Sequence, residues 1–252
     1  MSTPIALSIA GSDPSGGAGI QADLKTFHQF GVFGEAVITL ITVQNSRGVR
    51  RVDVLGAELV EAQIRAVIED IRPMAAKTGA LGNRAMVEML ARMAAGFDFP
   101  LVVDPVMLSS SGERLGEAME LLIPHAFLIT PNLEEASTLA GFAVNDPASM
   151  RRAAETLALM GAKNVLVKGG HLQGDATDLL WDGTFTEFAA PRIATDHTHG
   201  TGCALSAGIT AELAKGAPLA EAVKRAKGFV TQAIRSHPGL GGGSGPLNFF
   251  AR

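Results

Sequence analysis

The sequence predicts an α/β fold, a three-layer sandwich in which helices cover both faces of a mostly parallel central sheet. Short apolar runs alternate with helical patterns along the chain, which is typical of parallel strands joined by crossover helices. Hydrophobic residues make up 47% of the 252 residues and charged residues 18%, so a large core can form. Because neither a linker before residue 238 nor an internal repeat is present, we expect one domain over residues 1–252.

The first half of the chain supplies four of the expected strands and three helices. The first strand ends at Gly11, and Gly31 stops the helix that follows it. Apolar residues at helical spacing between Val60 and Ile71 predict the second helix. The expected strands are 5–10, 36–43, 75–79 and 101–104, and the helices are 18–30, 60–71 and the region around 86–93.

The second half continues the alternation with strands at 127–130 and 165–167. Asp146, Pro147 and Gly161 are typical of the N-cap, the first residue and the end of a helix. The pair Asp182-Gly183 predicts a hairpin between 178–181 and 185–188, with a turn that the next residue could lengthen. The last two helices are expected to start near residues 201 and 218. The glycine-rich run 239–245 is consistent with a mobile loop or with a binding segment.

Charge and composition exclude several classes of function. The net charge is −4 and no block of Lys and Arg occurs, which argues against nucleic acid and against a membrane surface as partners. One cysteine cannot form an internal disulfide framework. No apolar run reaches the roughly 18 residues that span a bilayer, and the N-terminus lacks the pattern of a secretory signal. A cytoplasmic protein is therefore expected.

Polar clusters follow the expected strands at the point where each strand ends, at 11–19, 44–45, 104–112, 130–135 and 168–171. In open α/β sheets ligands bind beyond the carboxyl ends of the strands, so these clusters predict one site. Two common nucleotide signatures are absent. No GxxxxGK[ST] motif occurs, and the two GxG pairs lack the third glycine of a dinucleotide fingerprint.

The stretch from His197 to Ala207 is the strongest chemical signal in the chain. Gly200 and Gly202 bracket Thr201 just before a helix-forming run. A glycine turn at a helix N-terminus presents free N–H donors and the positive end of the helix dipole, so it predicts an anion site for phosphate. Cys203 is the first side chain past this turn, where a lowered pKa would make it a base. Two loop histidines with no second cysteine argue against zinc.

Other strand-end residues fit a phosphate-transfer site, although each also has an ordinary structural interpretation. Asp104, Asn132 and Glu135 could hold Mg²⁺ or could be helix caps. Lys168, before two glycines, could contact phosphate or be a solvated surface lysine. The amide of Gln44 offers both a donor and an acceptor to a heterocycle, or it ends a strand.

These motifs occur in an order that resembles the hydroxymethylpyrimidine/phosphomethylpyrimidine kinases of thiamine biosynthesis, within the ribokinase-like superfamily. The resemblance runs from about residue 5 to 250 and is carried by IAGSDPSGGAGIQADLKT at 9–26, VQN at 43–45 with GV at 48–49, VDPVM at 103–107, ITPNL at 129–133 with Glu135, VKGGH at 167–171, HGTGC at 199–203 and GPLNFF at 245–250. It implies a ribokinase-like fold and phosphorylation by ATP, with Mg²⁺, of 4-amino-5-hydroxymethyl-2-methylpyrimidine and then of its monophosphate. A homodimer is also expected.

The resemblance assigns roles residue by residue. Pyrimidine contacts are implied for Gly11, Asp23, Gln44, Ala80 and Val106. ATP contacts are implied for Asn132, Lys168, Gly200 and Gly202, and metal contacts for Asp104 and Glu135. The catalytic set is Cys203 as the base, where the wider superfamily usually has Asp, together with Lys168 and the Gly200-Thr201-Gly202 turn.

The chain departs from the family pattern at two positions. Ala80 stands where Met often lines the pyrimidine pocket, and Ser109-Ser110-Ser111-Gly112 lacks a lysine that many members carry. The first change enlarges or softens the pocket, and the second removes a cation. Two alternatives therefore stay open: a pyridoxal- or pyridoxine-type vitamin kinase on the same fold, and a pyrimidine-binding sensor without catalysis.

Overall fold

The computed structural model describes residues 3–107, 118–170, 172 and 174–251. The strands are β1 (Ile5–Ser12), β2 (Phe33–Asn45), β3 (Gly48–Val54), β4 (Ala75–Thr78), β5 (Leu101–Val103), β6 (Leu128–Ile129), β7 (Val165–Val167), β8 (Ala176–Trp181) and β9 (Phe185–Ala190). The helices are α1 (Gly19–Gln29), α2 (Ala57–Asp70), α3 (Arg84–Ala94), α4 (Leu133–Ala140), α5 (Pro147–Leu159), α6 (Thr201–Ala214) and α7 (Leu219–Arg235). Two 3₁₀ turns are η1 (Met119–Leu121) and η2 (Ile123–His125).

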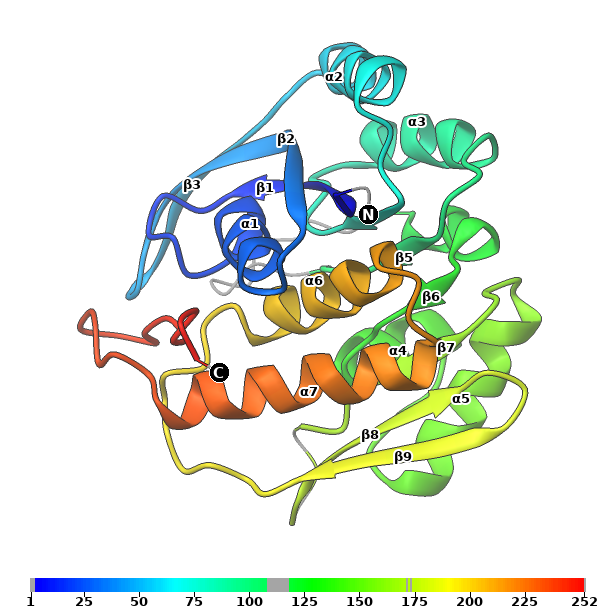
Figure 1. Cartoon of the computed structure of the whole chain (residues 1–252). Helices are drawn as coiled ribbons and strands as arrows, with labels where there is room; N and C mark the ends of the chain where they lie inside the picture. The colour runs from blue at the N-terminus through cyan, green and yellow to red at the C-terminus, as the bar shows by residue number, and fades with distance from the viewer. Residues whose placement is uncertain (1–2, 108–117, 171, 173, 252) are drawn as a thin grey trace.

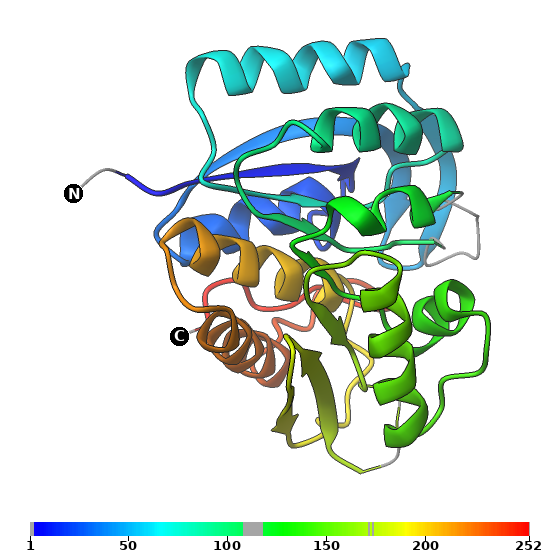
Figure 2. The same ribbon diagram turned by 90° about the vertical axis from the view of Figure 1, so that its right-hand side faces the viewer.

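These strands form one nine-stranded sheet in the order β3-β2-β1-β4-β5-β6-β7-β8-β9. The six strands from β2 to β7 in this order pair in parallel, whereas β3, β8 and β9 pair antiparallel at the two ends. Helices α1, α6 and α7 pack on one face of the sheet, and α2, α3, α4 and α5 pack on the other (Figures 1 and 2). The predicted three-layer α/β class is confirmed.

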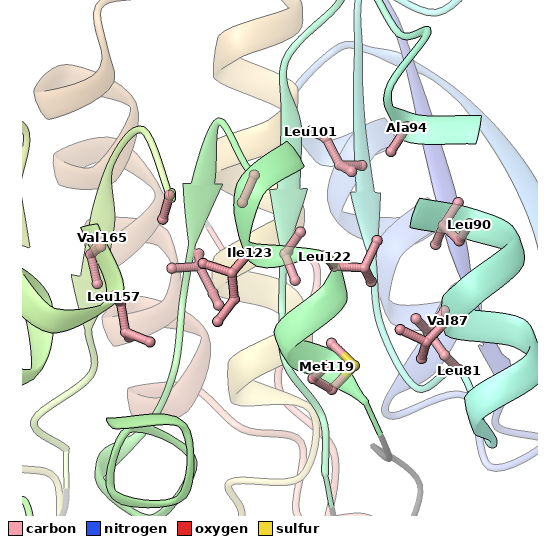
Figure 3. Close-up of a cluster of buried hydrophobic side chains, with 14 of the residues drawn as sticks. Leu81, Val87, Leu90, Ala94, Leu101, Met119, Leu122, Ile123, Leu157 and Val165 are labelled. Atoms are coloured by element: carbon pink, nitrogen blue, oxygen red, sulfur yellow. The ribbon is translucent and has the colours of Figure 1, made fainter. Parts of the chain in front are cut away.

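The larger part of the core lies between the sheet and the α2–α5 layer. Figure 3 shows Leu101 and Val165 of the sheet beside Leu90 of α3 and Leu157 of α5, with Leu122 between them. These side chains are 0–2% exposed, and burial of each such side chain contributes about 1.5–3 kcal/mol. Because successive strand residues point to opposite faces, the neighbouring residues of the same strands fill the core under α6 and α7.

Helix α6 is the most deeply buried helix of the second layer. Ten of its fourteen residues are buried, since α7 and α1 flank it while the sheet lies beneath it. Its length is that of an ordinary core helix. Over the part of the chain that the structure describes, no helix combines the length and the apolar character needed to cross a membrane.

One strand and one α-helix were not expected from the sequence. Strand β3 pairs with β2 through a turn at Ser46-Arg47, which lacks the glycine or asparagine that marks a short hairpin, and a register shift after Val43 breaks its alternation. Helix α4 is only eight residues long, too short for a clear apolar period. The expected hairpin is confirmed as β8–β9, with Trp181 opposite Phe185, so the turn has three residues.

Glu35 of β2 gives the fold a pH-dependent term. The side chain is 9% exposed and its Oε2 has no hydrogen-bond partner among the described residues. Burial raises the pKa of Glu35 from 4.5 to about 7, and the charge of Asp70 acts in the same direction. Between these two values the folded chain keeps a proton that the unfolded chain releases, so the free energy of unfolding falls as the pH rises through this window.

The variant Glu35→Gln should remove this dependence. We expect it to gain stability relative to the wild type on going from pH 5 to pH 8, because glutamine has no proton to lose. Calorimetric unfolding temperatures of both proteins at the two pH values measure the effect. A difference between the proteins that is the same at pH 5 and pH 8 would contradict the assignment.

Candidate active site

A cavity of about 1400 Å³ opens along the carboxyl ends of the parallel strands. It brings together twelve of the thirteen site residues expected from the sequence: Gly11, Gln44, Ala80, Asp104, Val106, Asn132, Glu135, Lys168, Gly200, Thr201, Gly202 and Cys203. The expectation that strand-end clusters meet at one place is therefore confirmed for these residues. The Ser109–Gly112 segment and His171 lie outside the described residues.

Two glycine-rich loops interlock at the centre of the cavity. Gly200 precedes α6 with φ of +83°, a conformation that favours glycine. A Cβ at Gly200 would lie 1.8 Å from the carbonyl oxygen of Gly17, so no side chain fits there. A Cβ at Gly202 would lie 3.4 Å from Nζ of Lys168. The N-terminus of α6 and a lysine thus share one small space, which suits an anion.

Lys168 connects the two carboxylates predicted to hold metal. Its Nζ donates to Oδ1 of Asp104 at 2.9 Å and lies 3.9 Å from Oε2 of Glu135. Thr130 and Ser206 also donate to Asp104, each at 3.3 Å. The alternative of a solvated surface lysine is excluded, because the Lys168 side chain is only 14% exposed.

Burial and charge set the protonation of this cluster. Burial raises the pKa of Glu135 to about 7, and the Asp104 charge adds to the rise while Lys168 opposes it. Burial alone would lower the pKa of Lys168, but the two carboxylates raise it well above its usual range. Asn132 holds Glu135 in place through a capping box, with its N–H donating to Oε2 at 2.7 Å. The cap interpretation of Asn132 is therefore confirmed, and Asn132 also lines the cavity, whereas its contact with ATP stays a prediction.

The donor set of this cluster fits Mg²⁺. Asp104 and Glu135 present carboxylate oxygens toward the same cation, Lys168, so both reach one point in the cavity. Mg²⁺ is held in proteins by one or two carboxylates, water and substrate phosphates, which matches a pair of acids in an open cavity.

A second polar cluster at the rim was not identified from the sequence. Asp13 accepts hydrogen bonds from the N–H groups of Ser15 and Ala18 and from Oγ of Ser15, at 2.8–2.9 Å. Its Oδ2 lies 2.8 Å from Nε2 of His199. Burial opposes ionisation, but His199 and Ser15 hold the pKa of Asp13 at about 2. The sequence signal is the position of His199 directly before the glycine turn, but the sequence does not show that Asp13 is its partner.

Gln44 contacts the same histidine. Its amide Nε2 lies 3.2 Å from Nε2 of His199. Because that ring nitrogen donates its hydrogen to Asp13, it has no lone pair for a second donor, so the amide oxygen must face the ring. Gln44 lines the cavity, so its amide NH₂ is then available to donate there.

Asp23 is placed differently from the expectation of a direct substrate contact. It is 0% exposed and does not line the cavity. Its carboxylate accepts from Nζ of Lys77 at 2.8 and 3.0 Å and from Oγ of Ser8 at 2.6 Å. The reason is that α1 starts at Gly19, so Asp23 lies one turn below the cavity and faces the sheet.

The predicted fall in the pKa of Cys203 is also wrong. Cys203 lines the cavity, but burial raises the pKa of its thiol to about 11. Lys77 and the backbone N–H of Gly19 act in the opposite direction without overcoming the burial. The helix N-terminus that favours a thiolate is itself desolvated, and desolvation is the larger effect.

The glycine-rich segment 239–245 packs against the turn between β2 and β3. Cβ atoms at Gly241 and Gly243 would lie 2.4 Å from Oγ of Ser46 and 2.2 Å from its carbonyl oxygen. Ser244, Ser46 and Arg47 line the cavity rim. The segment therefore needs small residues because two backbones approach each other closely at the rim.

The variant Gly243→Ala should lower the unfolding temperature. The added methyl meets backbone atoms that cannot rotate away, and overpacking of this kind costs about 1–3 kcal/mol, or roughly 2–4 °C per kcal/mol for a chain of this size. Gly228→Ala is the matched control, because a Cβ there meets nothing within 4 Å and alanine favours the helix. Equal unfolding temperatures for Gly243→Ala and the wild type would contradict the close approach.

Comparisons with known proteins identify the family. The family model described as phosphomethylpyrimidine kinase matches residues 13–248. The chain is 47% identical over 261 residues to a Bacillus subtilis hydroxymethylpyrimidine/phosphomethylpyrimidine kinase, covering 100% of this chain and 96% of the relative.

Solved structures of similar chains share the fold. An ADP complex of Bacillus subtilis pyridoxal kinase superposes with a TM-score of 0.90 at 38% identity, covering 99% of this chain and 98% of that one. A Clostridium difficile phosphomethylpyrimidine kinase has a TM-score of 0.80 at 42% identity, covering 91% and 99%. With its glycine turn, lysine, carboxylates and cysteine in one cavity, the chain belongs to the phosphomethylpyrimidine kinase family.

Proposed function

We propose that the protein transfers the γ-phosphoryl group of ATP to the hydroxymethyl group of 4-amino-5-hydroxymethyl-2-methylpyrimidine and then phosphorylates the resulting monophosphate. The observation that carries this proposal is the cavity itself. Lys168 and the Gly200–Gly202 turn suit phosphate, and the amide of Gln44, which lines the same cavity, suits a polar ring. Cys203 lines this cavity directly after the glycine turn.

In the first transfer the hydroxyl oxygen of the pyrimidine alcohol forms a bond to the γ-phosphorus of ATP. The bond between the γ-phosphorus and the β,γ-bridging oxygen breaks, and ADP leaves. The hydroxyl proton goes to the sulfur of Cys203, which becomes a thiol. Lys168 and the N–H groups of the Gly200–Gly202 turn stabilise the moving charge, which is how phosphoryl transfer is chiefly catalysed. Asp104 and Glu135 would hold Mg²⁺, which neutralises phosphate charge when bound.

Release of ADP with a panel of alcohols tests this proposal. With purified protein, ATP and Mg²⁺, we expect the pyrimidine alcohol to give a higher kcat/KM than pyridoxal or pyridoxine. No stimulation of ADP release by the pyrimidine alcohol would overturn the proposal. Binding of that alcohol without any ADP release would instead support the sensor alternative, which needs neither Lys168 nor the glycine turn.

A pyridoxal-type kinase is the second candidate. Ala80 lines the cavity where a longer side chain would narrow it, and the fold superposes on a pyridoxal kinase with a TM-score of 0.90. A pyridine vitamer also carries a hydroxymethyl group. The same panel decides, since Ala80→Met should then reduce the kcat/KM for pyridoxal more than that for the pyrimidine.

Gln44→Leu should weaken binding of the pyrimidine and leave ATP binding unchanged. Leucine is of similar size, but it cannot pair with the polar ring atoms, and each buried polar atom left unpaired costs roughly 1–3 kcal/mol. We expect the affinity for the pyrimidine alcohol to fall about tenfold or more. Calorimetric titration with each ligand measures both values. Unchanged pyrimidine affinity would mean that Gln44 only ends the strand.

We also propose that residues 1–252 act as one kinase domain that pairs as a homodimer in the cytoplasm. The exposed face of β2 supports pairing, because Ile41 and Val43 are 47% and 49% exposed two positions apart on the same side of the strand. The lone cysteine suits a reducing compartment. Sedimentation of Ile41→Lys tests the dimer, since a buried lysine at the interface should give monomers.

A further inference from the structure

One stripe of α6 faces β1 and β4 from Cys203 downward. Ala207 and Ala211 pack in a buried cluster with Ala6 of β1 and Ala75 of β4. Cys203 precedes Ala207 by four residues, so it lies on the same stripe of the helix, one turn nearer the cavity. Helical spacing therefore places Cys203 level with the part of β4 that follows Ala75, and the backbone N–H of Gly19 donates to its sulfur.

Lys77 occupies that part of β4. It follows Ala75 by two residues, so both side chains point to the same face of the sheet. Two strand residues rise by about 6.6 Å, and one helical turn rises by about 5.4 Å, so Lys77 and Cys203 keep level with each other. Lys77 is 0% exposed, and its Nζ lies 3.8 Å from the position of a Cβ at Gly79, a residue that lines the cavity.

Asp23 and Ser8 fix the lysine in this position. Asp23 takes two of the three ammonium hydrogens, at 2.8 and 3.0 Å, and Ser8 on the adjacent strand donates to Asp23 at 2.6 Å. An ion pair with both partners fully buried costs much desolvation, and well-packed apolar residues often serve stability equally well. Stabilisation of the fold alone therefore does not explain why the Lys77–Asp23 ion pair is buried near Cys203.

We propose that Lys77 is a positioning residue that serves as the counter-cation of the Cys203 thiolate. The inference rests on the proposed function of Cys203 as the base. Lys77 is held below the sulfur by Asp23, and it offers a positive charge when the sulfur is negative. The other groups that act on the charge of the sulfur are the N–H of Gly19, the carboxylates of Asp23 and Asp104, and Lys168.

The titration behaviour of the two groups agrees with this arrangement. Burial works against a charged lysine, but Asp23, Cys203 and Asp104 together raise the pKa of Lys77, so it stays charged. Lys77 is in turn the main group that opposes the effect of burial on the Cys203 thiol, whereas the charges of Asp23 and Asp104 add to that effect. Removing Lys77 and removing Asp23 should therefore shift the thiol in opposite directions.

The test uses the fact that Cys203 is the single cysteine of the chain. Labelling with [¹³C]cysteine gives one NMR signal whose shift follows thiol ionisation without any ATP or substrate. The variants compared are Asp23→Asn and the double variant Asp23→Asn with Lys77→Met, because methionine matches lysine in length and the neutral pair leaves no orphaned buried charge. Circular dichroism confirms that each variant is folded.

We expect the thiol of Asp23→Asn to titrate below that of the wild type, and the thiol of the double variant to titrate at least about one pH unit above Asp23→Asn, a tenfold change in thiolate fraction. Iodoacetamide, which reacts with thiolate, should then alkylate the double variant about tenfold more slowly at pH 8. Identical titrations of the two variants would overturn the inference. The two variants could instead show the expected titrations but have equal kcat for the alcohol. That result would support Lys77 as the counter-cation and overturn Cys203 as the base.

Discussion

Replacing Cys203 with serine should leave a folded protein whose first phosphorylation step is slower by about 10²–10⁴-fold, the usual contribution of a general base. A serine hydroxyl ionises far less readily than a thiol, so it supplies almost no base near neutral pH. In the wild type the pKa of about 11 also predicts that the rate rises with pH through the neutral range, because the thiolate fraction rises. The measurement is kcat for the pyrimidine alcohol from pH 6.5 to 9.

The second step provides an internal control for Cys203→Ser. A phosphate monoester is already largely ionised at pH 7, so its oxygen attacks ATP without losing a proton to the protein. The kcat for the monophosphate should therefore fall by less than about tenfold in the same variant. Equal losses for the alcohol and the monophosphate, or a wild-type kcat for the alcohol, would contradict the role of Cys203 as a base.

Replacing Lys168 with methionine should reduce both steps by a similar factor. The charge of Lys168 acts on the phosphoryl group that moves, whichever acceptor is present, and loss of one such group costs about 10²–10³ in kcat. Methionine keeps the length of the side chain. The variant also leaves Asp104 and Glu135 without the lysine cation that both contact. The pKa values of these two acids should therefore rise, so that they take up a proton more readily.

Steady-state kinetics with varied ATP, and with each acceptor in turn, measure the effect of Lys168→Met. Lys163→Met is the control, since Lys163 is an exposed lysine outside the cavity and should keep wild-type rates. Loss of pyrimidine affinity with unchanged ATP kinetics would mean that Lys168 contacts the pyrimidine and not ATP.

The fold was predictable where one physical signal dominated. Asp146 and Pro147 start α5 as expected, because a cap and a fixed φ act locally. The same holds for the glycine stop at Gly31 and for the hairpin around Gly183. Strand β3 could not be predicted, because its two-residue turn from β2 has no diagnostic residue and a register shift interrupts the alternation of the hairpin.

The sequence predicted most of the residues that line the site, but it did not predict the burial of Asp23 or the pKa of Cys203. Strand ends meet at one edge of a parallel sheet, so Asp104, Glu135 and Lys168 could be placed together from the sequence. The position of Asp23 below the cavity depends on Lys77, a partner 54 residues away. The pKa of Cys203 depends on the depth of burial, which only the packed structure provides.

The mass of the product formed from the aminopyrimidine alcohol tests the central claim most directly. Purified protein with ATP, Mg²⁺ and 4-amino-5-hydroxymethyl-2-methylpyrimidine should yield first a species with one added phosphoryl group and then a species with two, with one ADP formed for each group transferred. Release of ADP with the pyrimidine left unmodified, or phosphorylation of pyridoxal with none of the pyrimidine, would contradict it.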